Sequence, residues 1–388
     1  MGALDEALRQ VRARPWRRVV LERPVPVDAL PTPALLIDAD AFERNLARMS
    51  SSLVARGKGM RPHAKTHKCP LIALRQLEQG AVGICAAKVS EAAVLIGAGV
   101  DRVLVTSPVA DAERAGLLVA LSRACVALDV VVDSQFGLDL LRAAVAPGDR
   151  LGVLVDVDVA MGRTGTRELE TILALAETAR ATPGLLFRGI QHYAGQIMHL
   201  DGHAERRARS HALWEVVAKF VDALTARGLA PEVVTGGGTG TYDIDVEIPC
   251  VTDLQVGSYL FMDHQYRVVG GANGPVFDDF EVALQVVVTA ISQPRKGLIT
   301  VDGGYKAFAV DAGPPVPLDG GRFDYRFAGD EHGVLIGQGE VELPRLGERL
   351  RFVAPHCDPT VNLYDWYWVC RDGEAREIWP IAARGCSW

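Results

Sequence analysis

The sequence predicts an α/β fold: a (β/α)8 TIM-like barrel followed by a second, mostly β domain. Short apolar runs alternate with helical stretches about nine times before residue 270, at spacings of roughly 20 to 40 residues. The runs are continuously apolar, as in parallel strands that are buried on both faces. Beyond residue 270, strand-like runs follow one another without long helices between them. Eight or more strand–helix units in this length fit a barrel, and an open doubly wound sheet is the alternative.

The elements are expected in the following order. Residues 1–30 suggest a helix and then a proline-broken segment. The expected barrel strands are residues 34–38, 59–63, 82–85, 102–106, 129–133, 151–156, 185–191, 232–235 and 254–256. The strands of the second domain are expected at residues 280–291, 297–302, 333–337, 349–353 and 366–370. We therefore place the barrel at residues 30–270, and the β-rich domain at residues 1–29 and 271–388.

Composition and charge exclude several classes of protein. The 388 residues are 49% hydrophobic and 23% charged, as in an ordinary globular protein, and their net charge is −7. No basic block is large enough to neutralise a run of phosphates, and no apolar run reaches the ~18 residues of a membrane span. The N-terminal arginines fit a solvated amphipathic helix better than a targeting peptide. The seven cysteines are scattered without a CxxC pair, so we expect a reduced, cytoplasmic protein.

A basic stretch, Arg61-Pro-His-Ala-Lys-Thr-His-Lys68, surrounds Lys65 at the end of an expected strand. If the strand continues through it, residues 61, 63, 65 and 67 share one face. Neighbouring cations disfavour the charged form of a lysine, which makes its amine a better nucleophile, as in a Schiff-base lysine. The alternative is a solvated basic strand end.

Two glycine-rich segments follow late strands of the expected barrel, Thr235-Gly-Gly-Gly-Thr-Gly240 and Gln255-Val-Gly-Ser-Tyr259. Barrel active sites lie at the C-terminal ends of the strands, and loops after the last strands often bind phosphate through backbone N–H groups. Glycine runs are also common in tight turns that bind nothing. A phosphorylated aldehyde needs both an amine and a phosphate site, so pyridoxal phosphate is the economical candidate.

A third candidate site lies in the segment Pro355-His-Cys-Asp-Pro359. On an extended segment, His356 and Asp358 point the same way and offer one nitrogen and one carboxylate oxygen to a divalent metal, with water completing the shell. This donor set suits Mn²⁺ or Mg²⁺. Cys357 in place of Asp358 would favour Zn²⁺, but it should face the opposite side. A hydrogen-bonded turn before the proline is the alternative.

Seven segments, in order from residue 32 to residue 362, match the motifs of one known family. They are Thr32-Pro-Ala-Leu-Leu-Ile-Asp38, Arg61-Pro-His-Ala-Lys-Thr-His-Lys-Cys69, Lys88-Val-Ser-Glu-Ala92, Gly236-Gly-Gly-Thr-Gly240, Leu254-Gln-Val-Gly-Ser-Tyr259, Asp330-Glu-His-Gly333 and His356-Cys-Asp-Pro-Thr-Val-Asn362. Together they resemble the metal-activated D-threonine aldolases, whose relatives include 3-hydroxy-D-aspartate aldolases and eukaryotic-type D-serine dehydratases. The resemblance implies the alanine-racemase-like fold, with a barrel that holds pyridoxal 5′-phosphate and a β domain that carries a metal site.

The resemblance also implies roles for individual residues. Lys65 would bind the cofactor as a Schiff base, and His199 would be a catalytic residue near the metal and the substrate hydroxyl. The cofactor would be surrounded by Lys65, Arg163, Tyr193, Gly237, Gly238, Thr239, Gly257, Ser258 and Tyr259. The metal ligands would be His356 and Asp358, with Mn²⁺ or Mg²⁺ favoured over Zn²⁺. His192 and Ala87 depart from the residues expected at their positions, a small residue and a glutamine, and both would reshape the substrate pocket.

The implied activity is that of a lyase that uses pyridoxal phosphate and a divalent metal. It would cleave D-threonine and related D-3-hydroxy amino acids to glycine and an aldehyde. Asp358 stands where D-serine dehydratases of this type have cysteine, which favours aldol cleavage. The alternatives are a 3-hydroxy-D-aspartate aldolase, a D-serine dehydratase-type lyase that yields a keto acid, and a non-catalytic carrier of the cofactor. The expected partners are the small-molecule substrate and a second copy of the chain in a homodimer, without nucleic acid or membrane.

Overall fold

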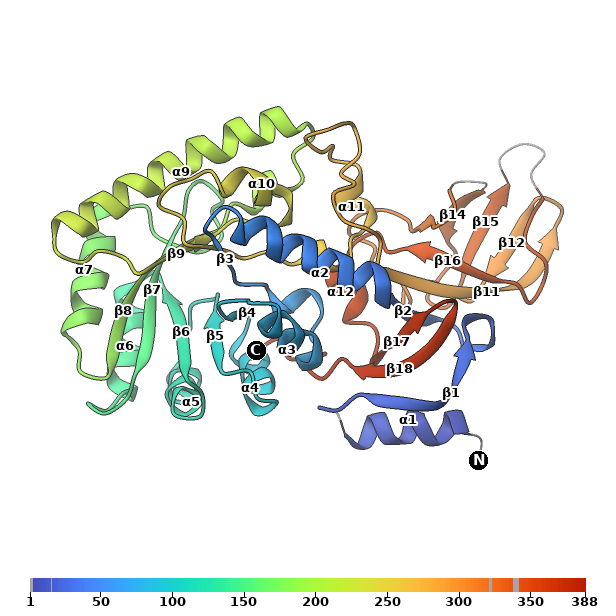
Figure 1. The fold of residues 1–388 in the computed structure, drawn as a ribbon, viewed down its shortest axis with the longest axis horizontal. Helices are drawn as coiled ribbons and strands as arrows, with labels where there is room; N and C mark the ends of the chain where they lie inside the picture. Colours follow the sequence, from blue (N-terminus) through green and yellow to red (C-terminus); the bar gives the residue numbers. More distant parts are fainter. Residues whose placement is uncertain (1–2, 15, 321–322, 338–341) are drawn as a thin grey trace. The chain divides into compact units, whose positions relative to one another are not determined.

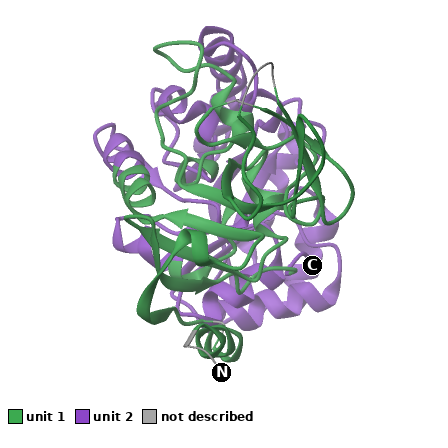
Figure 2. Ribbon diagram, turned by 90° about the vertical axis from the view of Figure 1, so that its right-hand side faces the viewer, with its two compact units in different colours: residues 1–47, 66–71, 258–385 green, residues 48–65, 72–257, 386–388 purple. Residues whose placement is uncertain are grey.

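A computed structural model describes residues 3–14, 16–320, 323–337 and 342–388, and the chain divides into two compact units. Unit 1 comprises residues 1–47, 66–71 and 258–385, and unit 2 comprises residues 48–65, 72–257 and 386–388 (Figure 2). Unit 2 contains the parallel sheet and unit 1 the mostly antiparallel sheet, so each unit has one sheet of its own.

Unit 2 is a barrel of eight parallel strands in the order β3-β10-β9-β8-β7-β6-β5-β4 (Figure 1). Its strands are β3 (Gly59–Met60), β4 (Ile84–Ala86), β5 (Arg102–Val105), β6 (Ala127–Val132), β7 (Leu151–Val157), β8 (Leu185–His192), β9 (Val233–Gly236) and β10 (Asp253–Leu254). The ring closes between the first and last strands of this order, where Val82 N donates to Met60 O and Cys85 N donates to Pro62 O. The barrel expected from the continuous apolar runs is therefore confirmed.

Helices follow the barrel strands, as expected for βα units. They are α3 (Pro70–Glu78), α4 (Val89–Gly97), α5 (Ala112–Ser122), α6 (Gln135–Ala144), α7 (Leu169–Ala181), α8 (Gly195–Met198), α9 (His203–Ala226) and α10 (Tyr242–Asp245). Local chemistry sets several of their starts. The side chain of Asp111 accepts a hydrogen bond from Arg114 N before α5, and Ser134 accepts one from Gly137 N before α6.

The barrel interior consists of an apolar layer and a polar layer. Five buried side chains from five strands form the apolar cluster: Cys85, Leu104, Val131, Leu154 and Val233. Residues two positions further along a strand point to the same side, toward the C-terminal end of the barrel. At those positions stand Ala87, Thr106, Asp133, Asp156 and Thr235, all of which are polar except Ala87. The polar layer therefore lies on the side of the barrel where active sites are built.

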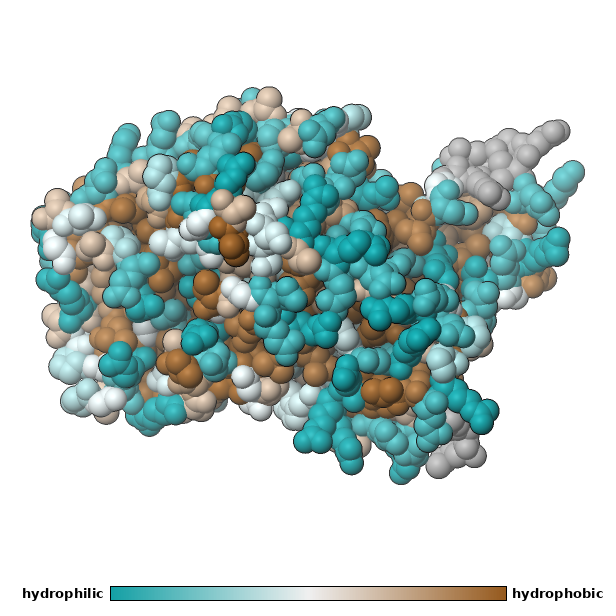
Figure 3. All heavy atoms as spheres, viewed as in Figure 1, coloured by the Kyte–Doolittle hydropathy of each residue, from teal (hydrophilic) through white to brown (hydrophobic). Residues whose placement is uncertain are grey.

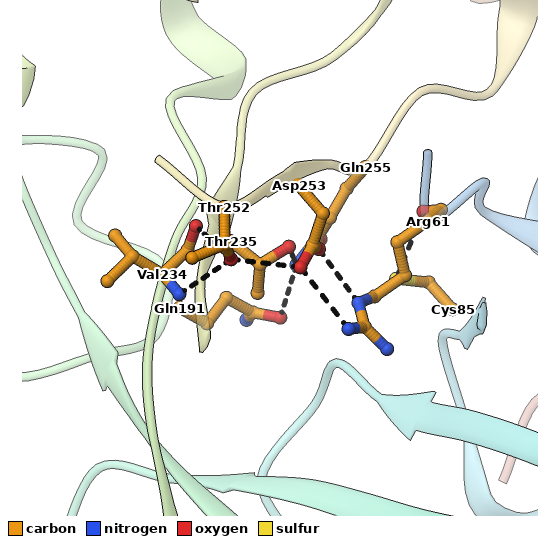
Figure 4. Close-up of polar contacts among 8 residues, drawn as sticks. All are labelled: Arg61, Cys85, Gln191, Val234, Thr235, Thr252, Asp253 and Gln255. Atoms are coloured by element: carbon orange, nitrogen blue, oxygen red, sulfur yellow. Dashed lines mark hydrogen bonds and ion pairs between the residues drawn. The ribbon is translucent and has the colours of Figure 1, made fainter. Parts of the chain in front are cut away.

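Hydrogen bonds join the polar layer into a network across the barrel. Gln191 Nε2 donates to Asp156 Oδ1 at 3.0 Å, and Gln255 Nε2 donates to Gln191 Oε1 at 3.0 Å and to Thr235 Oγ1 at 3.3 Å. Figure 4 shows Gln191, Thr235 and Gln255 of this network beside the pair formed by Arg61 and Asp253. Buried polar groups that find partners in this way avoid the desolvation penalty of unpaired ones.

Unit 1 contains a ten-stranded, mostly antiparallel sheet in the order β1-β18-β17-β2-β11-β12-β15-β14, with β16 paired to β11 and β13 paired to β16. The strands are β1 (Val19–Pro26), β2 (Ala34–Asp38), β11 (Leu284–Arg295), β12 (Leu298–Val301), β13 (Val316–Pro317), β14 (Phe323–Phe327), β15 (Gly333–Gly337), β16 (Arg349–Val353), β17 (Trp366–Arg371) and β18 (Glu374–Pro380). Helix α1 (Ala3–Ala13) packs on this sheet through Ala7 and Val11, in a core that includes Trp368 and Ile378.

The expectation that residues 34–38 form the first barrel strand is wrong. Strand β2 pairs antiparallel with β11 and parallel with β17, so it belongs to the sheet of unit 1. Four of its five residues are buried, because it lies in the middle of that sheet. A strand that is buried on both faces reads as a continuous apolar run in either kind of sheet, and the pattern alone cannot distinguish them.

The helix that follows this strand, α2 (Ala39–Val54), begins in unit 1, where Asp38 Oδ1 accepts hydrogen bonds from Asp40 N and Ala41 N. Among the described residues, no helix combines the length and the apolar character that crossing a membrane requires. On the face drawn in Figure 3, hydrophobic side chains are scattered among hydrophilic ones.

Candidate active site

Lys65 lies five residues beyond the C-terminal end of strand β3, in a short 3₁₀ helix (Ala64–Thr66), and its side chain is half-buried. The strand itself ends at Met60. The expected extended segment, with residues 61, 63, 65 and 67 on one face, is therefore wrong. The chain turns at Lys65, which places the amine at the rim of the barrel rather than along a strand face.

His63 is held by hydrogen bonds on both ring nitrogens. Its Nδ1 accepts from Lys65 N at 3.3 Å, and its Nε2 lies 3.1 Å from Thr106 Oγ1, which in turn donates to Ala86 O. With Nδ1 as an acceptor, Nε2 is the ring nitrogen that can donate to Thr106 Oγ1. His63 therefore supports the turn that carries Lys65.

Arg61 is an internal ion-pair partner. Its Nε and Nη2 donate to the Asp253 carboxylate at 2.8 and 3.2 Å, and both side chains are buried (Figure 4). Burial alone would lower the pKa of Arg61, but the charge and hydrogen bonds of Asp253 raise it above its ordinary value. The expectation that a cluster of cations activates Lys65 is wrong in this respect, because the charge of Arg61 is neutralised inside the barrel.

Lys65 shares an aromatic neighbour with Arg163. The ring of Tyr193 lies 5.9 Å from Lys65 Nζ and 5.2 Å from the guanidinium carbon of Arg163. Tyr193 follows strand β8 and Arg163 follows strand β7, so three strand ends meet at this ring. A cation within about 6 Å of a ring centre is attracted to the ring. The structure thus brings together three of the residues that the family resemblance assigns to the cofactor.

The loop that carries Arg163 is fixed by two carboxylates. Asp158 Oδ1 accepts from Met161 N at 2.8 Å and from Gly162 N at 3.0 Å, and its other oxygen binds Arg167. Asp156 accepts from Thr164 Oγ1 at 2.7 Å. Burial raises the pKa of Asp156 although its hydrogen bonds oppose the shift. These contacts hold the loop that carries Arg163.

The glycine-rich loop follows strand β9 and includes Gly237, Gly238 and Thr239, the last of which begins a buried 3₁₀ helix (Thr239–Thr241). Gly237 has a φ of 66°, in the left-handed region that favours glycine. At Gly240, a Cβ would lie 2.2 Å from the carbonyl oxygen of Met198, so only glycine fits. The loop lies against α8 at a separation that admits no side chain.

The second glycine-rich segment spans the boundary between the units in the sequence. Gly257 follows strand β10 in unit 2. Ser258 and Tyr259 begin a buried 3₁₀ helix (Ser258–Leu260) in unit 1, where the Tyr259 ring meets Phe280 edge to face at 5.7 Å. The role of these three residues around a phosphate stays a prediction.

Two histidines lie at and beyond the end of strand β8 in the sequence: His192 is its last residue, and His199 follows it. His199 ends helix α8, directly after Met198, which packs under the glycine-rich loop. His192, one of the departures from the family pattern, is buried, and burial lowers its pKa to about 4. Its ring meets Trp214 edge to face at 4.9 Å. His192 is therefore neutral at pH 7 and packs in the core of the barrel unit, between strand β8 and helix α9 (His203–Ala226).

The expected metal ligands lie in unit 1 at a helix start. His356 is the extended residue before helix α12 (Cys357–Val361), and Asp358 lies in its first turn. The expectation of a continuous extended segment is therefore wrong. His356 Nδ1 contacts Asp311 Oδ2 at 2.6 Å. A carboxylate on one ring nitrogen orients the other nitrogen, as in many histidine ligands of metals. Among the described residues, no group of three or more His, Cys, Asp or Glu side chains could hold a metal ion.

Sequence reasoning missed three residues that support these sites. Asp311 lies 45 positions before its histidine partner, too far for a motif to connect them. Arg206 and Asp245 are buried beneath the glycine-rich loop. The sequence feature that could have indicated Arg206 and Asp245 is that both are charged residues at positions that the helical pattern would bury.

Comparison with known proteins identifies relatives that cover most of the chain. A family model described as "Alanine racemase, N-terminal domain" matches residues 37–265, and a model of a serine dehydratase domain matches residues 283–370. The D-threonine aldolase of Arthrobacter sp. is 39% identical over 93% of this chain and 95% of its own length. The 3-hydroxy-D-aspartate aldolase of Paracoccus denitrificans (strain Pd 1222) is 38% identical over 91% of this chain and 92% of its own.

A solved structure extends the comparison to the fold. The crystal structure of D-threonine aldolase from Filomicrobium marinum matches with a TM-score of 0.90 and 37% identity, over 95% of this chain and all of that one. Both the barrel and the β domain are thus shared with that enzyme. This chain therefore belongs to the alanine racemase-like family that includes D-threonine aldolase and 3-hydroxy-D-aspartate aldolase.

Proposed function

We propose that this protein cleaves D-threonine and related D-3-hydroxy amino acids to glycine and an aldehyde, with pyridoxal phosphate and a divalent metal as cofactors. The observation that carries the proposal is the arrangement at the barrel rim. A half-buried lysine, Lys65, lies at a strand end beside Tyr193 and Arg163, and the same unit contains a tightly packed glycine-rich loop. An amine and a phosphate site in one barrel are what a phosphorylated aldehyde requires. The aldolase relatives support the choice of reaction.

The residues present fit pyridoxal phosphate. Lys65 would bind its aldehyde carbon covalently, and the backbone of Gly237, Gly238 and Thr239 would receive its phosphate, together with Gly257, Ser258 and Tyr259. Tyr193 and Arg163 would contact the ring and its substituents. When bound, this cofactor supplies an electron sink for the pair released as the Cα–Cβ bond breaks.

The residues of unit 1 fit a divalent metal with few protein ligands. His356, oriented by Asp311, and Asp358 would hold it, and water and the substrate would complete its shell. A metal at this position would lower the pKa of a bound hydroxyl. One imidazole and one carboxylate favour Mn²⁺ or Mg²⁺ over Zn²⁺, which more often takes thiolates.

The proton transfers would use side chains of this chain. His199 is the proposed general base, which removes the proton from the substrate 3-hydroxyl as the carbon–carbon bond breaks. The hydroxyl oxygen becomes the aldehyde oxygen, the bonding pair stays with the glycine fragment, and a proton returned to Cα completes glycine. Lys65 would hold the cofactor, and its amine would supply the nucleophile that binds the aldehyde carbon of the cofactor.

A second candidate is the same cleavage of 3-hydroxy-D-aspartate. The 3-hydroxy-D-aspartate aldolase of Paracoccus denitrificans and the D-threonine aldolase of Arthrobacter are almost equally similar to this chain. The two reactions differ only in the substituent at Cβ, a methyl group or a carboxylate. We further propose that the protein acts in the cytoplasm as a homodimer, as expected from the sequence.

The test is an assay of the purified protein with pyridoxal phosphate and Mn²⁺. D-threonine should yield acetaldehyde and glycine, 3-hydroxy-D-aspartate should yield glyoxylate and glycine, and EDTA should abolish both. Lys65→Ala should lose the visible absorbance of lysine-bound cofactor together with activity. Formation of a keto acid from D-serine without any aldehyde would reject the aldolase in favour of a dehydratase. If the protein binds the cofactor but converts none of the three substrates, the remaining interpretation is a non-catalytic carrier of the cofactor.

A further inference from the structure

Helix α9 presents a stripe of buried polar side chains to the glycine-rich loop. Arg206, Ser210 and Trp214 are spaced four residues apart, so they lie on one face of the helix. All three are buried, and Arg206 is 0% exposed. A polar stripe of this kind is unusual, because the buried face of a surface helix is normally apolar. Each of the three side chains binds the segment that follows strand β9.

Arg206 binds two backbone carbonyls that belong to different loops. Its Nε donates to Gly240 O at 2.6 Å, and its Nη1 donates to Leu200 O at 2.8 Å. Gly240 is the residue after Thr239, at the end of the proposed phosphate loop. Leu200 directly follows His199, the proposed general base. One guanidinium thus ties together the two loops that carry these groups.

The other two members of the stripe, Ser210 and Trp214, bind Asp245, which lies in the short helix α10 that follows the loop. Ser210 Oγ donates to Asp245 Oδ1 at 2.5 Å, and the Trp214 side chain also donates to this carboxylate. Thr241 Oγ1 donates to Asp245 Oδ2 at 2.5 Å. The loop and the helix that follows it are therefore attached to α9 at both ends of the stripe.

The packing leaves the loop little room to move. Gly240 lies so close to Met198 O that a Cβ would meet it at 2.2 Å, and a Cβ on Gly237 would meet Asp245 Oδ2 at 2.4 Å. The loop is enclosed by α8 on one side and by Asp245 on the other, with Arg206 bound to its end. Displacement of any one of these contacts would shift the backbone N–H groups of the loop.

We propose that Arg206 is a positioning residue, which fixes the loop Gly236–Gly240 in the conformation that receives the cofactor phosphate and couples it to the segment that carries His199. This inference depends on the proposed function, since it assumes that the loop binds a phosphate. A guanidinium suits the role because its five N–H donors have a fixed geometry and its charge is permanent.

The test compares two ligands, pyridoxal 5′-phosphate and pyridoxal, on the full chain freed of cofactor. Both can react with Lys65, but only the first uses the loop. Arg206→Gln should weaken binding of pyridoxal phosphate roughly ten-fold or more, since hydrogen bonds to a charged group contribute about that factor. Its affinity for pyridoxal should stay within about two-fold of the wild-type value. Affinities are measured by titration of the bound-cofactor absorbance.

Further variants separate positioning from folding. Arg209→Gln is the matched control, because Arg209 lies on the same helix, is exposed and pairs only locally with Glu205 in the contacts described. It should bind both ligands as the wild type does. Ser210→Ala, a small change in the same stripe, should weaken the binding of pyridoxal phosphate but not of pyridoxal, and by less than Arg206→Gln does. The affinity of Arg206→Lys for pyridoxal phosphate should lie between those of Arg206→Gln and the wild type. A lysine keeps the positive charge but lacks the fixed donor geometry of the guanidinium.

The outcomes are distinct. Equal weakening of both ligands in Arg206→Gln would overturn the proposal, because it would indicate a general structural role. If Arg206→Gln does not fold, Ser210→Ala and Arg206→Lys decide. The proposal is overturned if these two variants bind both ligands as the wild type does, or if their affinities for both ligands fall equally. If the wild-type protein binds pyridoxal as tightly as pyridoxal phosphate, the assignment of the loop as the phosphate site is refuted. A wild-type protein that binds neither ligand would instead refute the proposed function itself.

Discussion

The carboxylate of Asp253 binds the guanidinium of Arg61 through two hydrogen bonds, of 2.8 and 3.2 Å, inside the barrel. Asp253 is the first residue of strand β10, and Arg61 follows strand β3, its neighbour in the sheet. The pair therefore joins the two ends of the chain's barrel segment. It also neutralises a charge that would otherwise lie four residues before Lys65.

Asp253→Ala should destabilise the protein by about 3–5 kcal/mol, because it leaves the buried Arg61 without its counter-charge. Chemical denaturation of the wild type and the variant measures the difference. Asp139→Ala is the control, since Asp139 pairs with Arg142 on the exposed surface of α6 and its removal should change stability little. Equal effects of the two substitutions would contradict a structural role for the buried pair.

The barrel could be predicted from the sequence because each of its strands is a local apolar run followed by a helical stretch. The same reasoning placed Lys65 at a strand end, the family resemblance added Arg163 and Tyr193, and the structure brings these three together around one ring. Prediction from strand ends works because the topology of a barrel sends every C-terminal strand end to the same face.

Features that depend on distant partners could not be predicted. The partner of Arg61 lies 192 positions away, so no local pattern revealed that its charge is neutralised. Strand β2 was assigned to the wrong sheet for the same reason, because its partners β11 and β17 come late in the chain. At His356, the helix start was not foreseen, since the following Cys-Asp-Pro offers a weak helical signal.

Gly240→Ala should destabilise the protein by roughly 1–3 kcal/mol, because its methyl group would overlap the backbone oxygen of Met198. The same displacement should weaken binding of pyridoxal phosphate. Gly116→Ala is the matched control in helix α5, where a Cβ meets nothing within 4 Å. It should be neutral or stabilising by about 0.5–1 kcal/mol, since alanine favours helices. A Gly240→Ala protein as stable as Gly116→Ala would show that the loop can move away from α8.

The stability that Asp245 contributes should depend on pH. Burial raises its pKa from the ordinary value of 3.8 to about 6, although Ser210, Thr241 and Trp214 donate hydrogen bonds to it. A carboxyl with a raised pKa in the folded state contributes stability that is fully present below pH 4 and is lost as the pH rises through 6. The loss should be on the order of 3 kcal/mol.

The comparison with Asp245→Asn isolates this carboxyl, because asparagine cannot ionise. Between about pH 4 and pH 7, the unfolding free energy of the wild type should fall relative to that of the variant. Chemical denaturation across this range measures the difference, and Asp222→Asn, an exposed change on α9, should show no such trend. A constant difference between wild type and Asp245→Asn would mean that Asp245 titrates alike in the folded and unfolded states.

Asp311→Asn should weaken metal binding by about 10- to 100-fold, the range found when a carboxylate that orients a histidine ligand is removed. Asp311 Oδ2 lies 2.6 Å from His356 Nδ1, so its charge makes the imidazole a better donor and fixes the plane of the ring. Titration of the purified protein with Mn²⁺ measures the affinity without reference to activity. Asp319→Asn, an exposed change in the same unit, is the control.

The Asp311 variant also distinguishes two roles of His356. If His356 binds the metal, Asp311→Asn should weaken Mn²⁺ binding less than His356→Ala does, because the ligand itself remains. If His356 only forms an ion pair with Asp311, both variants should bind Mn²⁺ as the wild type does. Because Asp311 is half exposed, its removal should leave the fold intact, and the effect on Mn²⁺ can be assigned to the orientation of one imidazole.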